Sequence, residues 1–154
     1  GDYPFVTSRS TNASGFLSEA GIGPKEVRDV YVILKPYTTR VAAGPMIDEV
    51  LNEKVLEWAE KIGGETGTVS GRKRRIGGFE WENVLEVMRM NSATKIAISH
   101  MDCPDFVWNL LGYKNGGEFL HTVYKRICNV FPKPEVALLS YGPRIEDMIK
   151  FEGN

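Results

Sequence analysis

The chain contains 154 residues, of which 42% are hydrophobic and 25% are charged, and its formal net charge is -1. This length and composition are typical of a single globular domain with its own core, and they exclude a chain that is disordered throughout. The nearly neutral charge also argues against broad electrostatic capture of nucleic acid.

The chain carries only two cysteines, Cys103 and Cys128, and they lack Cys-x-x-Cys spacing. Neither a disulfide framework nor a structural zinc site is therefore indicated, which favours the reducing cytoplasm as its location. No apolar stretch approaches the length of a membrane span, so we expect no membrane association. Because the chain begins with Gly1 rather than with methionine or a signal sequence, we expect that a preceding segment has been cut away.

Predicted helices and strands alternate along the chain. Apolar residues spaced three and four apart predict helices, and short apolar runs rich in β-branched residues predict buried strands. In chain order we expect a helix at 13–20, a strand at 30–34, helices at 50–62 and 80–90, a strand at 95–99, a helix at 119–130 and a strand at 136–139. The first helix should stop at Gly21, and Pro24 suits the first turn of a further helix. This alternation predicts an α/β fold with a largely parallel sheet flanked by helices.

The segments that follow the three predicted strands are polar or contain glycine. They cover residues 38–45, 99–102 and 140–144. In open α/β sheets, ligands gather beyond the carboxyl ends of the strands. Taken alone, residues 140–143 favour a simple strand-to-helix turn, but three such ends together with the basic run favour a composite ligand site.

Four consecutive cations occupy residues 72–75, within a run that extends from Gly67 to Gly78. Flanking glycines lower helix propensity and let the backbone approach a ligand closely, so we expect a loop. Arginine matches carboxylate or phosphate with two parallel hydrogen bonds, and hydroxyl side chains at Thr68 and Ser70 add further donors. The run indicates an anion site, although a nucleic-acid patch or plain surface charge would have a similar composition.

Asp102 follows the second predicted strand. A carboxylate at this position can accept two parallel hydrogen bonds from the N1–H and exocyclic amine of guanine, a pattern that adenine does not offer. The alternative is that Asp102 caps a following helix near Pro104. Its neighbour His100 either stacks on a base or lies on the surface.

Five hydroxyl residues crowd the start of the first predicted helix. Backbone N–H groups at a helix start favour phosphate, and hydroxyls can add to such a site. Ordinary capping explains only one or two of the five. The five residues are Thr7, Ser8, Ser10, Thr11 and Ser14.

The chain contains no phosphate-loop motif of the form Gly-x-x-x-x-Gly-Lys-Ser/Thr, no His-Glu-x-x-His and no Gly-x-Ser-x-Gly. We therefore identify no complete catalytic centre and assign no catalytic or metal-binding residue within this chain.

Six segments occur in the order expected of adenylosuccinate synthetases. They lie at residues 1–8, 21–24, 39–45, 71–77, 91–94 and 140–143. The chain resembles the C-terminal half of that family over nearly all of residues 1–145, most closely its compact archaeal and viral forms. The resemblance implies that residues 1–154 are the C-terminal portion of a single domain with a fold related to that of P-loop proteins, and that the N-terminal phosphate-loop half is absent.

The resemblance also implies an activity in purine nucleotide biosynthesis. Family members are ligases that form a C–N bond between L-aspartate and IMP, through 6-phosphoryl-IMP, and convert GTP to GDP and phosphate with Mg²⁺ present. They are homodimers. The catalytic aspartate, the catalytic histidine and the expected Mg²⁺ ligands belong to the family's N-terminal half, so we expect this chain to be inactive alone.

The resemblance implies roles for individual residues as well. The residues expected to bind IMP are Thr7, Val41 and Arg72. Those expected to bind aspartate are Thr68, Val69, Ser70, Gly71, Arg72, Lys73 and Arg74. Those expected to bind GTP are Arg74, His100, Met101, Asp102, Ser140, Tyr141 and Gly142, with Asp102 reading the guanine.

One position departs from the family pattern, because His100 stands where the family usually has a lysine that lies along the base. This leaves open a phage-type relative that makes 2-aminoadenylosuccinate from dGMP and aspartate with ATP. A non-catalytic nucleotide-binding module, or one half of a split enzyme, is a further alternative. An isolated fragment of a shared sheet should expose a strand edge and apolar surface, and should associate or be poorly soluble.

Overall fold

The computed structural model describes residues 10–41, 43–67, 71–127 and 133–151. Four strands form the main sheet in the order β1-β4-β5-β6, and two more form a separate antiparallel pair, β2 and β3. The strands are β1 Tyr31–Leu34, β2 Thr38–Arg40, β3 Arg75–Gly77, β4 Lys95–Ile98, β5 Glu135–Ser140 and β6 Met148–Lys150. The helices are α1 Ala13–Ala20, α2 Glu53–Lys61, α3 Trp81–Met90, α4 Asp105–Leu110 and α5 Gly116–Arg126, with 3₁₀ turns η1 Pro24–Glu26 and η2 Ile145–Asp147.

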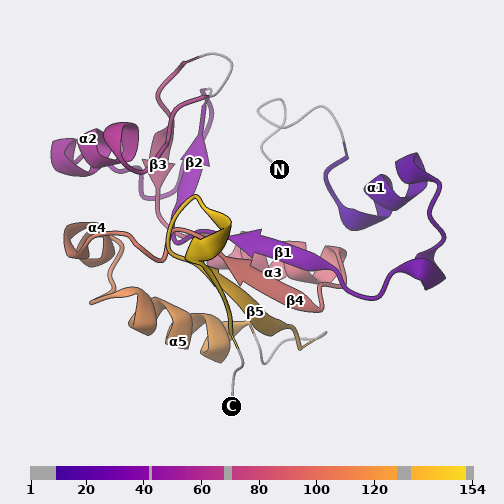
Figure 1. The fold of residues 1–154 in the computed structure, drawn as a ribbon. Helices are drawn as coiled ribbons and strands as arrows, with labels where there is room; N and C mark the ends of the chain where they lie inside the picture. Colours follow the sequence, from indigo (N-terminus) through magenta and orange to yellow (C-terminus); the bar gives the residue numbers. More distant parts are fainter. Residues whose placement is uncertain (1–9, 42, 68–70, 128–132, 152–154) are drawn as a thin grey trace.

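The main sheet is largely parallel, which confirms the predicted α/β class. β1 pairs in parallel with β4, and β4 pairs in parallel with β5, whereas β6 joins β5 in the antiparallel direction. Each parallel step needs a crossover, and α3 and α5 lie in the two crossovers (Figure 1). Both steps run in the same direction across the sheet, so the right-handed rule places α3 and α5 on one face.

The core lies between this face and the helices, and Phe119 of α5 is at its centre. The Phe119 side chain is fully buried, and its ring packs against four other aromatic rings within 6.2 Å between centroids. Those rings belong to Phe79, Trp81, Trp108 and Tyr113. The contact between Trp81 of α3 and Phe119 shows that the two crossover helices meet over the sheet.

The opposite face of β1 is open in the described part of the chain. Leu34 faces the core, but Tyr31 is 48% exposed and Ile33 is 74% exposed. The prediction that residues 30–34 form a buried strand is therefore wrong for one of its faces. The apolar run had two faces to cover, and helices cover only one of them here. An exposed apolar strand at the sheet edge is what we expected of part of a shared sheet.

Helix boundaries follow the capping residues more closely than the apolar pattern. Helix α1 covers the predicted residues and ends at Gly21, whose φ of 66° is left-handed, and η1 begins at Pro24 as expected. Helix α2 begins only at Glu53, because the Asn52 side chain accepts a hydrogen bond from the Val55 amide. The short elements β2, β3, α4 and β6 were not predicted, since they contain too few residues to show a period.

Candidate functional site

A cavity of about 210 Å³ lies beyond the carboxyl ends of β4 and β5. The segments after these strands are tied together, because the Met101 amide donates to the Ser140 carbonyl oxygen at 3.0 Å. The segment that ends α2 forms another wall, through Trp58 and Gly63. Four residues singled out from the sequence line this cavity, and these are His100, Asp102, Ser140 and Gly142.

Asp102 contributes an exposed carboxylate to this cavity. The alternative role as a helix cap is wrong, because α4 begins after Pro104 and no side chain caps its first turn. The carboxylate therefore lies beside a cavity at the end of a parallel strand, in the position where such folds bind ligands.

His100 is held in an unusual backbone conformation beside Asp102. Its φ is 60°, a left-handed value that few residues other than glycine adopt. The Ser99 hydroxyl lies 2.9 Å from its Nδ1 atom, and the Tyr37 ring packs edge-on at 5.6 Å between centroids. Burial lowers the pKa of His100 below its usual range, and the charge of Lys35 adds to this, while Glu65 and Asp102 act in the opposite direction. The imidazole is therefore neutral at physiological pH.

The cation run forms a tight hairpin at its base. Thr66 and Lys73 make an isolated antiparallel bridge, and the Gly67 amide donates to the Arg72 carbonyl oxygen at 2.8 Å. Gly71 has a φ of 61°, which requires glycine or a strained residue. The prediction of a loop is wrong for Arg75–Gly77, which form strand β3, because these residues pair with β2. Thr68, Val69 and Ser70 lie outside the described residues.

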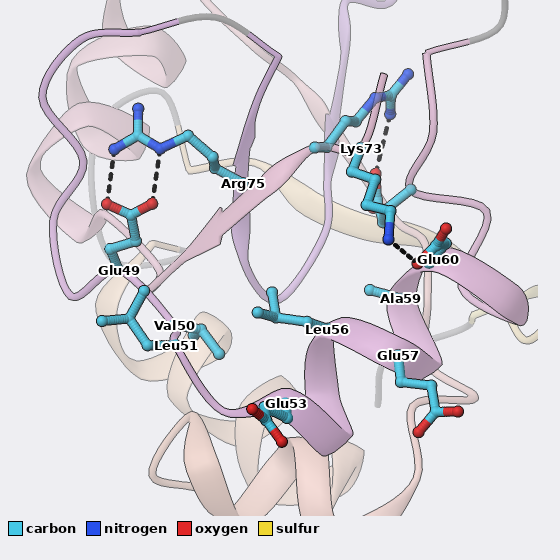
Figure 2. A pocket seen from close by; sticks show the side chains of 12 residues that line it. Glu49, Val50, Leu51, Glu53, Leu56, Glu57, Ala59, Glu60, Lys73 and Arg75 are labelled. Carbon is cyan, nitrogen blue, oxygen red and sulfur yellow. Dashed lines mark hydrogen bonds and ion pairs between the residues drawn. The ribbon is translucent and has the colours of Figure 1, made fainter. Parts of the chain in front are cut away.

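Glutamates pair with Lys73, Arg74 and Arg75 of the basic run. Lys73 pairs with Glu60 at 2.6 Å, and Arg75 pairs with both oxygens of Glu49 at 2.6 Å. Figure 2 shows these two pairs on opposite sides of a cavity of about 420 Å³, with Leu56 between them. The sequence pattern does not reveal these two carboxylates, because neither lies within the basic run itself.

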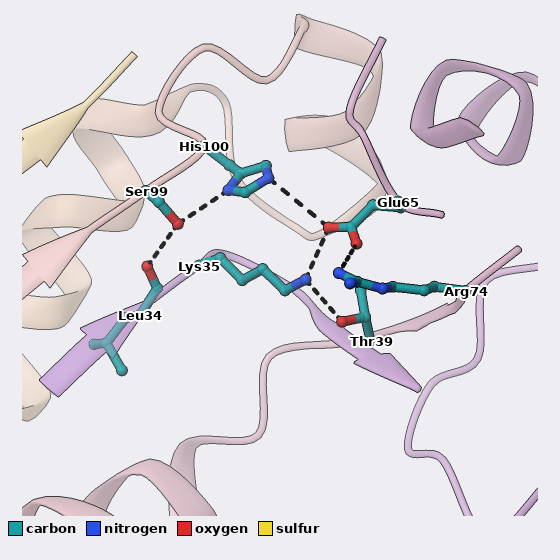
Figure 3. A network of polar contacts seen from close by, with 7 residues as sticks. All are labelled: Leu34, Lys35, Thr39, Glu65, Arg74, Ser99 and His100. Atoms are coloured by element: carbon teal, nitrogen blue, oxygen red, sulfur yellow. Dashed lines mark hydrogen bonds and ion pairs between the residues drawn. The ribbon is translucent and has the colours of Figure 1, made fainter. Parts of the chain in front are cut away.

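Glu65 pairs with the third of these cations, Arg74, and is itself almost wholly buried, with 2% exposure. Its carboxylate lies between three side chains in Figure 3. Arg74 Nη1 is 3.0 Å from Oε2, Lys35 Nζ is 2.8 Å from Oε1, and His100 Nε2 is 3.8 Å from Oε1. Lys35 also donates to the Thr39 hydroxyl at 2.7 Å. Nothing in the sequence connected Glu65 with these residues, which come from separate segments.

The ionisation of Glu65 follows from these contacts. Burial alone would raise the pKa of its carboxyl, but the hydrogen bond and charge of Lys35, together with Arg74, outweigh burial and hold it below the usual range. Burial lowers the pKa of Lys35, and Glu65 opposes that change. The cluster therefore carries an ionised carboxylate between two cations.

The described residues contain no group of three or more histidine, cysteine or acidic side chains that could hold a metal ion. Within the same residues, no helix is both long and apolar enough to cross a membrane.

The family model described as adenylosuccinate synthetase matches residues 1–147. This chain belongs to the adenylosuccinate synthetase family. An adenylosuccinate synthetase from Methanococcus aeolicus is 48% identical over 97% of the chain and 44% of its own length. The chain thus spans less than half the length of the curated relatives it matches. Family members are ligases of purine biosynthesis.

Two solved structures share the fold of this family member. A fully ligated adenylosuccinate synthetase from Plasmodium falciparum superposes with a TM-score of 0.83 at 22% identity, over 99% of this chain and 46% of that one. A cyanophage S-2L succinoaminodeoxyadenylate synthetase, solved with dGMP and dATP, gives a TM-score of 0.70 at 22% identity, over 97% and 41%.

Three residues that the family resemblance assigned to GTP do not line the cavity beyond β4 and β5, and one of them, Arg74, lines the cavity of about 420 Å³ instead. Met101 is buried in the core, and only its backbone joins the cavity segments. Tyr141 is 44% exposed, and its amide donates to the Asp147 carbonyl oxygen at 3.0 Å. A strand-end segment turns sharply, so neighbouring side chains point in different directions even where the segment is correctly identified.

The residues that the resemblance assigned to IMP are less well defined by the fold. Thr7 lies outside the described residues, and Val41 is exposed just after β2.

The cap of helix α1 is Asn12, whose side chain accepts from the Gly15 amide at 2.7 Å. The Ala13 amide donates to the Asn91 side chain at 2.7 Å, so two amides at this helix start already have partners within the chain.

Proposed function

We propose that this chain supplies the nucleotide-base and aspartate contacts of an adenylosuccinate synthetase that joins L-aspartate to IMP and converts GTP to GDP and phosphate. The observation that carries the proposal is the cavity beyond β4 and β5, which gathers Asp102, His100, Ser140 and Gly142. Residues far apart in the sequence meet there, at the carboxyl ends of parallel strands, where open α/β sheets bind ligands.

Asp102 is the residue we assign to the guanine. Its exposed carboxylate can accept hydrogen bonds from N1–H and the exocyclic amine together, and adenine lacks that pair of donors. Ser140 and Gly142 form the neighbouring wall, where the Ser140 hydroxyl donates to the Gly142 carbonyl oxygen at 2.8 Å. A site built around such paired hydrogen bonds discriminates strongly between bases.

The cation hairpin is the part we assign to aspartate. Arg72 and Arg74 would hold its carboxylates with planar guanidinium groups, with Gly71 allowing close backbone approach. We also assign Lys73 and residues 68–70 to aspartate, and we assign Arg72, Thr7 and Val41 to IMP. The Nη1 atom of Arg74 is engaged by Glu65, and a guanidinium has four further N–H donors for a ligand.

The phosphoryl-transfer groups are expected outside this chain. We propose that the catalytic aspartate, the catalytic histidine and the Mg²⁺ ligands come from the other half of the enzyme, so that residues 1–154 are inactive alone. Mg²⁺ would neutralise charge on the transferred phosphate. We further propose a homodimer in the cytoplasm that binds neither nucleic acid nor membrane.

A phage-type activity with dGMP, aspartate and ATP is the second candidate. His100 favours it, because a neutral imidazole replaces the family's lysine beside the base. The fold likeness to the cyanophage enzyme is compatible with both activities. A non-catalytic nucleotide-binding module or half of a split enzyme is compatible with the share of the relatives' length that the chain spans.

Calorimetric titration separates these candidates. GTP, ATP, IMP and dGMP are each titrated into this chain, alone and mixed with the N-terminal half of the Methanococcus aeolicus relative. Binding of GTP and IMP, with activity restored by the added half, supports adenylosuccinate synthesis. Preference for ATP and dGMP supports the phage-type enzyme, binding without restored activity supports the module, and no binding in any mixture contradicts the assignment of the cavity.

A further inference from the structure

We propose that Glu65 is a positioning residue that sets the aspartate-binding Arg74 and the base-side His100 in one fixed geometry. This inference rests on the proposed function, because it assigns a role to a residue between the two proposed ligand sites. Glu65 is almost wholly buried, so in this proposal it acts through the side chains that its carboxylate holds.

The contacts of Glu65 join four separate segments. Lys35 follows β1, Glu65 follows α2, Arg74 precedes β3 and His100 follows β4. Figure 3 shows that the carboxylate is the common point among them, with one oxygen toward Arg74 and the other toward Lys35 and His100. A substitution of Glu65 therefore affects the contacts of Arg74 and those of His100 together.

The main chain also fixes Glu65. Its amide donates to the Ala59 carbonyl oxygen at 2.8 Å, and its own carbonyl oxygen accepts from the Arg74 amide at 3.0 Å. Glu65 and Arg74 are therefore joined through both backbone and side chain. Because its backbone is held in this way, the Glu65 carboxylate has a fixed position, and it fixes the position of the Arg74 guanidinium in turn.

Stability alone does not explain this cluster. A buried carboxylate with two cations is often no more stabilising than apolar residues of the same volume, because removing the charges from water costs nearly as much as their attraction returns. The cluster contacts the imidazole of His100, and the backbone of His100 is strained because its φ is left-handed. Strained residues persist where surrounding contacts hold them, and such places are commonly ligand sites.

The first test measures whether Glu65 influences the ionisation of His100, and it needs no nucleotide. The chain has two histidines, so the imidazole signals of His100 and His121 can be followed by NMR as pH is varied. The charged groups that face His100 are Glu65, Lys35 and Asp102. Because Glu65 favours the protonated imidazole, Glu65→Gln should lower the pKa of His100. The signal of His121, which is exposed on α5, serves as the internal reference.

The second test reads ligand binding in the chain combined with the N-terminal half of the Methanococcus aeolicus relative. Glu65→Gln should weaken GTP binding and raise the KM for aspartate, each by about tenfold, as is typical when a residue that orients a ligand-binding side chain is removed. Glu49→Gln is the matched control, because Glu49 pairs with Arg75, next to Arg74, on the protein surface. It should change neither value by more than about twofold.

The outcomes distinguish the two proposals. If the unsubstituted protein binds no GTP, the proposed function fails, and the His100 titration still decides whether Glu65 controls that side chain. If it binds GTP but Glu65→Gln leaves both ligand constants unchanged, the positioning role is wrong. Should Glu65→Gln fail to fold, Glu65→Asp keeps the charge but shortens its reach. Intermediate GTP and aspartate constants then support the role, and unchanged constants overturn it.

Discussion

The amide of Met101 donates to the carbonyl oxygen of Ser140 at 3.0 Å. This single hydrogen bond holds the segments after β4 and β5 side by side, so that Asp102 and Gly142 share one cavity. A purine base that meets both segments would be read by groups from two strands at once.

Asp102→Asn should weaken GTP binding by about 10- to 100-fold in the chain combined with the N-terminal half, since the amide replaces one of two acceptors with a donor. Calorimetry with GTP and ATP measures the change. The ratio of GTP to ATP affinity should fall with it.

The matched control for Asp102 is Asp105→Asn, in the first turn of α4. It removes a carboxylate three positions away that does not line the cavity. Equal losses from both substitutions would show that general charge, and not base reading by Asp102, explains the effect.

Gly142→Ala should weaken GTP binding by about tenfold, because small displacements in a binding site cost at least this much. A methyl group on Gly142 would collide with the carboxylate of Asp147, which accepts a hydrogen bond from the Arg144 amide at 2.9 Å. The segment must therefore shift.

The double variant Gly142→Ala with Asp147→Ala removes the colliding carboxylate, so GTP affinity should recover much of the loss. Asp147→Ala alone gives the baseline for this comparison. No recovery in the double variant would mean that the collision is not the cause.

Acid should destabilise the fold in two steps. Burial holds the pKa of His100 below its usual 6.5, so the unfolded chain takes up this proton first, and stability falls as pH drops through 6.5. The pKa of Glu65 lies below its usual 4.5, so its stabilising contribution is complete above that value and is lost as pH falls through the folded-state pKa.

Urea unfolding at a series of pH values measures these two steps. His100→Gln should flatten the stability curve just below pH 6.5, and Glu65→Gln should flatten it below pH 4.5. Curves that keep the shape of the unsubstituted protein would contradict the assigned ionisation of both groups.

Phe119→Ala should lower the free energy of unfolding by about 3–5 kcal/mol, because it empties the centre of the aromatic core. Chemical denaturation measures this loss. Phe16→Ala is the control, since that side chain is 58% exposed on α1, and its loss should stay near 0.5 kcal/mol.

The sequence by itself determined the fold class and the main strands. Apolar runs and three- and four-residue spacing are local properties, so they identified β1, β4, β5 and most of the long helices. It also identified the strand-end segments and the basic run, because glycines, hydroxyls and cations are visible wherever they stand. The family resemblance followed from the order of such motifs.

Only the tertiary structure decided which of these segments meet. The bond between Met101 and Ser140 joins two strand ends, and the pairing of Glu65 with Lys35, Arg74 and His100 joins four segments. It also decided that Ile33 is exposed, since a strand's own residues do not show which of its faces a helix covers. Contacts between distant segments depend on how the whole chain folds, and no local sequence pattern specifies them.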